Sequence, residues 1–142
     1  MRWRPRLPRS ITGPEAVADE FAKVVVEELA AWPPRVEWSQ PAEAARFAPL
    51  YAPGELLVRG PGKEAIQAAF RLARWDLLRH TEAIDEFWRT DRSSARDRLV
   101  IELAWRWLVE AALEVSERTD GRVGRAHLVE GLERAERMLL AG

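Results

Sequence analysis

The segment from Arg98 to Arg118 has the most distinctive pattern of hydrophobic and polar positions in the chain. Polar residues return at almost every fourth position, and apolar residues fill most of the positions between them. The polar positions are Arg98, Glu102, Arg106, Glu110, Glu114 and Arg118. In an α-helix these residues form only a narrow stripe, so the rest of the circumference must be covered. The pattern therefore predicts either the central helix of a bundle or a helix that a partner chain completes.

The geometry of this helix predicts several neighbours rather than one. Positions four apart are rotated by about 40°, so the polar stripe winds around the helix and leaves different faces buried at its two ends. Ser94 followed by Asp97 indicates a capping box at its start, and Gly121 suits a left-handed stop. Along its surface, we expect Arg106 to pair with Glu102 and Glu110.

Four further segments place apolar residues three and four positions apart, which is typical of amphipathic helices. The first follows Thr12 and Glu15, a predicted capping box, and ends at Pro33. The apolar positions are Val17, Phe21, Val25, Leu29 and Trp32 in the first, Ile66, Ala69, Phe70, Ala73 and Leu77 in the second, Ile84, Phe87 and Trp88 in the third, and Leu128, Leu132, Ala135 and Leu139 in the last. The joins between the later helices are short, so residues 63–140 should form a compact bundle.

Residues 33–62 are the least regular part of the domain because prolines interrupt every longer pattern there. We expect a short helix within 42–47 and at most a minimal two-stranded β element that pairs 35–38 with 55–59. The predicted fold class is therefore mainly α: a small bundle of about five helices around a central helix at 95–118. An extended arm at 1–11 precedes a single helical domain at 12–142.

Composition narrows the class of protein. The 142 residues suit one domain with a single core. The chain contains no cysteine, which excludes disulfides, thiolate metal sites and cysteine nucleophiles and fits a cytoplasmic location. The most apolar stretch is broken by charge at every fourth position, so we expect no membrane span. The net charge is −1, with a basic arm attached to an acidic body.

Tryptophan is unusually frequent, with seven residues in the chain. Trp105 and Trp107 point about 200° away from each other on one helix, so one small core does not easily take both rings. We expect one of the two to face another layer or another chain. The predicted partner-binding residues are Trp3, Trp88, Trp105 and Trp107, because exposed tryptophans are typical of binding hot spots. The alternative is that these rings fill the core.

Two basic regions provide a second candidate surface. One is the arm, with Arg2, Arg4, Arg6 and Arg9. The other is a helix face with Lys63, Arg71 and Arg74, which follows a glycine-rich turn. Both can contact phosphates or acidic protein surfaces, but either can also be only a solvated surface. The turn is no nucleotide-binding P-loop, because Leu57 stands in place of the first glycine of that motif and Glu64 in place of its hydroxyl residue.

No residue pattern predicts catalysis, a cofactor or a metal. His80 and His127 lack the paired Glu-x-x-His motifs of a helical di-metal site, and no serine lies in a nucleophile motif. The sequence therefore predicts a non-catalytic interaction or accessory subunit that binds protein, either its own copies or a larger assembly. The alternative is a nucleic-acid-associated protein that uses the arm and the Lys63/Arg71/Arg74 face.

Overall fold

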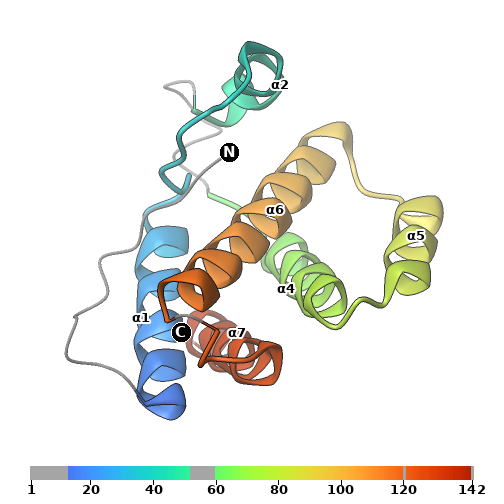
Figure 1. The fold of residues 1–142 in the computed structure, drawn as a ribbon. Coiled ribbons are helices and arrows are strands. Elements are labelled where there is room, and N and C mark those ends of the chain that lie inside the picture. The colour runs from blue at the N-terminus through green and yellow to red at the C-terminus, as the bar shows by residue number, and fades with distance from the viewer. Residues whose placement is uncertain (1–12, 52–59, 120, 142) are drawn as a thin grey trace.

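Helix α6, Ala95–Arg118, crosses the middle of the fold and contacts α1, α2 and α4 (Figure 1). The computed structural model describes residues 13–51, 60–119 and 121–141. The other helices are α1 Pro14–Ala30, α2 Pro41–Tyr51, α4 Lys63–Leu77, α5 Thr81–Thr90 and α7 Arg125–Ala141. The prediction of a mainly helical protein is confirmed. None of the described helices has the length and apolar character that crossing a bilayer requires.

The described ranges contain six helices, so the predicted count of about five is not confirmed. The difference is α2, which extends the expected short helix at 42–47 to eleven residues and continues through Pro49. No strand lies in these ranges, although Glu37, within the predicted segment 35–38, forms a β-bridge. The predicted partner at 55–59 and the arm at 1–11 lie outside the residues that the structure describes.

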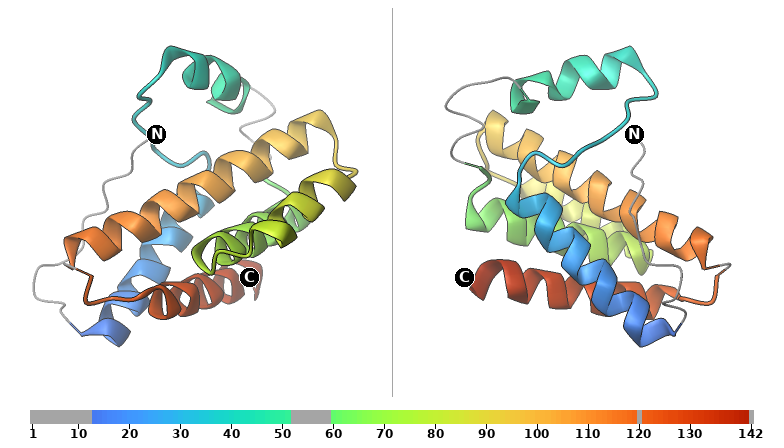
Figure 2. Two further views of the ribbon diagram at one scale, coloured as in Figure 1. Left: turned by 45° about the vertical axis from the view of Figure 1, so that its right-hand side comes forward. Right: turned by 90° about the vertical axis from the view of Figure 1, so that its left-hand side faces the viewer.

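The core lies between two pairs of helices. Helix α1 packs along α7, and α4 packs along α6, while α4 also contacts α7. Gly131 allows the close approach of α1 to α7: a Cβ at this position would be 3.0 Å from Cδ1 of Phe21 and 3.1 Å from the carbonyl oxygen of Ala18. Helix α2 lies on the opposite side of α6 from α7 in both views of Figure 2.

The ends of α6 follow the sequence signals. Ser94 Oγ accepts a hydrogen bond from the Asp97 N–H at 3.1 Å, as a helix cap requires. After the helix, Gly121 has a φ of 73°, and its N–H donates to the Ser116 carbonyl at 2.9 Å. The start of α1 differs from the prediction, because Gly13 is its N-cap and makes no side-chain cap bond.

The two tryptophans of α6 have different environments. Trp107 is completely buried. Trp105 lies on the other side of the helix and is only partly buried. Trp107 is thus a core side chain of the folded chain, which corrects its assignment as a partner-binding residue. The expectation that one of the two rings faces outward from the core applies to Trp105.

We predict that Trp107→Ala lowers the free energy of unfolding by about 3–5 kcal/mol, because it leaves a large cavity in a fully buried site. Urea denaturation followed by circular dichroism measures this change. Leu113→Ala is the control on the same helix, because this side chain is 45% exposed. Its effect should stay within about 0.5 kcal/mol. Equal effects of the two substitutions would contradict the placement of Trp107 in the core.

Candidate functional site

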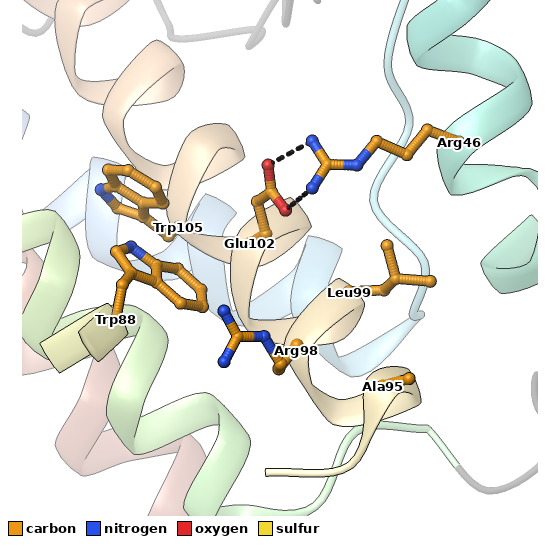
Figure 3. A pocket seen from close by; sticks show the side chains of 7 residues that line it. All are labelled: Arg46, Trp88, Ala95, Arg98, Leu99, Glu102 and Trp105. Atoms are coloured by element: carbon orange, nitrogen blue, oxygen red, sulfur yellow. Dashed lines mark hydrogen bonds and ion pairs between the residues drawn. The ribbon is translucent and has the colours of Figure 1, made fainter. Parts of the chain in front are cut away.

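Two neighbouring hollows open along the outer face of α6, and together they are called the α6 groove. The first encloses about 670 Å³ near the start of the helix, and the second encloses about 420 Å³ further along it. Arg46, Trp88, Ala95, Arg98, Leu99, Glu102 and Trp105 line the first (Figure 3). Asp76, Glu102, Trp105, Arg106, Val109 and Glu110 line the second. Glu102 and Trp105 line both hollows, so the two lie next to each other along α6.

One wall of the α6 groove is aromatic. The ring centroids of Trp88 and Trp105 are 5.9 Å apart, and Phe87 packs edge-on against Trp88 at 5.1 Å. Trp105 Nε1 donates a hydrogen bond of 3.2 Å to Asp76 Oδ2, which fixes the orientation of the indole. Helix α5 has no fully buried residue among its ten. This wall therefore presents large apolar rings that the chain itself covers only in part.

The opposite wall is helix α2, which two ion pairs connect to α6. In one pair α2 supplies the arginine, and in the other it supplies the glutamate. Arg46 of α2 donates two hydrogen bonds to Glu102 of α6, at 2.6 and 2.5 Å. One turn further along α6, Arg106 donates to Glu43 of α2. Glu102 and Arg106 thus both pair across to α2, whereas their spacing predicts pairs along α6 itself. The guanidinium carbons of Arg46 and Arg106 also lie 5.4 and 5.8 Å from the centroid of the buried Phe47 ring.

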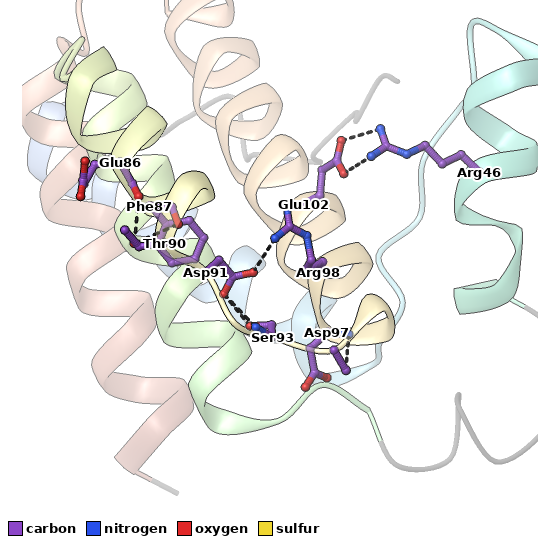
Figure 4. Close-up of polar contacts among 10 residues, drawn as sticks. Arg46, Glu86, Phe87, Thr90, Asp91, Ser93, Asp97, Arg98 and Glu102 are labelled. Atoms are coloured by element: carbon purple, nitrogen blue, oxygen red, sulfur yellow. Dashed lines mark hydrogen bonds and ion pairs between the residues drawn. The ribbon is translucent and has the colours of Figure 1, made fainter.

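Arg98 stands at the N-terminal end of the groove. Its guanidinium carbon is 5.2 Å from the Trp88 ring centroid, and its Nη1 is 3.3 Å from Asp91 Oδ2. Asp91 also accepts a hydrogen bond from Ser93 Oγ at 2.7 Å (Figure 4). These contacts hold the connection between α5 and α6 close to the aromatic wall.

The residues that the sequence predicted for partner binding and basic contacts do not lie together in the structure. Trp88 and Trp105 lie together in the groove, and Trp107 lies in the core. Lys63 is exposed, Arg71 is exposed with its guanidinium carbon 6.0 Å from the Trp75 ring centroid, and Arg74 forms a 2.6 Å ion pair with Glu136. The expected basic face is therefore partly neutralised at Arg74. The remaining predicted residues, Trp3, Arg2, Arg4, Arg6 and Arg9, lie outside the described part of the chain.

Sequence reasoning missed Glu43, Arg46 and Arg98 as groove residues. Glu43 and Arg46 are three positions apart, which places them on one helical face, and this spacing was an available signal. Nothing in the sequence alone indicates that α6 supplies their partners. In the ranges that the structure describes, no cluster of three or more histidine, cysteine, aspartate or glutamate side chains has an arrangement suited to a metal ion.

Comparison with known proteins adds no assignment. No family model matches the chain, and no match was found among curated proteins or solved structures. The groove must therefore be interpreted from its own geometry and chemistry.

The ion pair between Glu43 and Arg106 predicts a pH dependence. The hydrogen bond from Arg106 lowers the pKa of Glu43 below its ordinary value of 4.5. A lowered pKa in the folded state stabilises the fold above the unfolded-state pKa, and this contribution is lost as the pH falls through the folded-state pKa. We predict that Glu43→Gln lowers the urea midpoint at neutral pH, and that the difference from the wild type shrinks once the pH falls below 4.5.

The matched control for this prediction is Glu82→Gln. It removes the same charge from an exposed position on α5, at the opposite side of the groove. A difference between wild type and Glu43→Gln that is constant from neutral pH to below 4.5 would contradict the role of this carboxylate in attaching α2.

Proposed function

We propose that the protein is a non-catalytic docking module that binds a helical segment of another polypeptide in the α6 groove. The observation that carries this proposal is a line of apolar side chains on the outer face of α6. Trp105, Val109 and Leu113 follow one another at intervals of four residues, the first two partly buried and Leu113 45% exposed. Such a row is the ridge that one helix presents to another.

The dimensions of this face suit a helical partner. From Ala95 to Leu113, α6 rises about 27 Å, which is the length of about five helical turns. The walls formed by α2 and α5 flank the first part of this face. An amphipathic helix placed along it would bury the apolar row and the exposed edges of Trp88 and Trp105, in the manner of helix-in-groove recognition. Aromatic side chains of this kind contribute strongly to binding when a partner excludes water from them.

The charges of the groove favour a polypeptide over nucleic acid. Asp76 and Glu110 line its second hollow, and carboxylates repel a continuous phosphate backbone. Nucleic-acid binding through the Arg-rich arm and the Lys63/Arg71/Arg74 face stays the alternative proposal. The nucleic-acid alternative predicts an affinity that falls steeply as the salt concentration rises. The affinity for an apolar helical face should change little with salt concentration.

The docking proposal predicts the outcome of a selection with a displayed library of helical peptides. The wild-type chain should enrich peptides with apolar residues at i, i+3 or i+4, and i+7. Leu113→Glu should weaken their binding at least about tenfold, because it places a charge on the apolar row. Isothermal titration calorimetry with the selected peptides measures the change.

Met138→Glu is the matched control, because Met138 is 48% exposed on α7, outside the groove. This variant should bind the selected peptides as the wild type does. Failure to enrich any such peptide, or equal binding by Leu113→Glu, would overturn the docking proposal.

A further inference from the structure

We propose that Arg46 and Arg98 form a carboxylate clamp at the N-terminal end of the α6 groove, so that the docked helix carries an acidic side chain beside its apolar face. This inference rests on the proposed docking function and specifies the chemistry of the partner. It combines two guanidinium groups from different helices, α2 and α6, which line the same hollow with the two indoles (Figure 3).

Arg46 and Arg98 each carry more N–H donors than their ion pairs use. A guanidinium group carries five N–H donors. Arg46 directs two nitrogens to Glu102, and Arg98 directs one to Asp91. The side chains of Arg46 and Arg98 are 55% and 44% exposed, so their other donors are accessible from solvent. Figure 3 shows the Arg46 guanidinium against the Glu102 carboxylate and the Arg98 guanidinium beside the Trp88 ring.

The existing contacts orient the guanidinium groups of Arg46 and Arg98 but leave some of their N–H donors without a partner in the groove. The two bonds from Glu102 hold the plane of the Arg46 guanidinium, and the face of Trp88 supports Arg98. At 3.3 Å, the bond from Arg98 to Asp91 is longer than the usual charge-assisted bond of about 2.7–2.9 Å. The Asp91 side chain is only 8% exposed, whereas that of Arg98 is 44% exposed, so Asp91 leaves much of the guanidinium open to solvent. A ligand carboxylate would therefore meet ordered donors.

Charge is distributed unevenly along the groove. The first hollow is lined by two cations and one anion, Arg46, Arg98 and Glu102. The second is lined by three carboxylates and one guanidinium, those of Asp76, Glu102, Glu110 and Arg106. Because Asp91 also pairs with Arg98, the charges at the first hollow balance, whereas those at the second are negative in sum. An acidic side chain is therefore accommodated better at the first hollow, next to Trp88. This polarity also argues against a polyanion, which would have to pass the acidic end.

The clamp predicts how a defined probe binds. The probe is a stapled helical peptide of about fifteen residues, with leucines at i, i+4 and i+8 and a glutamate one turn before the first leucine. A second peptide has glutamine in place of that glutamate. We expect the full-length wild-type chain to bind the glutamate peptide about tenfold more tightly, because charge-assisted bonds to guanidinium groups are lost with glutamine. Fluorescence anisotropy measures both dissociation constants.

Arg98→Gln tests the assignment through a double-mutant cycle. The preference for the glutamate peptide should fall to less than about twofold in this variant, because the charge and donors that recognise the carboxylate are gone. Arg89→Gln is the matched control, since it removes an exposed arginine of α5 that does not line the groove. It should keep the wild-type preference. Arg46→Gln provides a second test if circular dichroism shows that Arg98→Gln is not folded.

The possible failures are distinguishable. Equal wild-type affinities for the two peptides would overturn the clamp and leave the docking function standing. Absence of binding by either peptide, together with an unsuccessful library selection, would overturn both. Displacement of the glutamate peptide by a duplex DNA oligonucleotide at comparable concentration would overturn the clamp in favour of a phosphate site.

Discussion

The burial of α6 is the constraint on which the rest of the structure depends. The helix is 24 residues long and apolar on most of its surface, so no single neighbour can cover it. Leu103, Trp107 and Leu108 are completely buried in the core that α1, α4 and α7 complete. Those helices leave the outer face to α2 and α5, which cover it only in part. The row formed by Trp105, Val109 and Leu113 follows directly from this incomplete cover.

The walls of the groove are attached by interactions of different kinds. On one side, Arg46–Glu102 and Arg106–Glu43 connect α2 to α6 by charge, so this wall depends on the ionisation of carboxylates. On the other side, the Trp105 indole donates to Asp76 and packs against Trp88, so this wall depends on aromatic packing and one hydrogen bond. The same charges that attach α2 also order the guanidinium of Arg46 for the proposed clamp. Attachment of the wall and recognition of a ligand are thus coupled.

The sequence by itself determined the buried faces of α1, α4 and α7. The positions of Phe21, Val25, Phe70 and Leu132 on amphipathic stripes are a local property, because helical periodicity alone places them on one side. The start of α6 at Ser94 is equally local, since a hydroxyl cap needs only residues three positions away.

Only the tertiary structure decided which charges pair and which tryptophan faces outward. Arg106 has carboxylates at both i−4 and i+4 on its own helix, yet it pairs with Glu43, 63 positions earlier. Helical periodicity places Glu102 and Glu110 within reach of Arg106, but it carries no information about carboxylates on other helices. Exposed ion pairs contribute only about 0–1 kcal/mol, so local spacing does not decide the partner. In the same way, the spacing of Trp105 and Trp107 predicts that their rings point to opposite sides of α6. Which ring lies in the core depends on where α1 and α4 lie around α6, and long-range packing sets this.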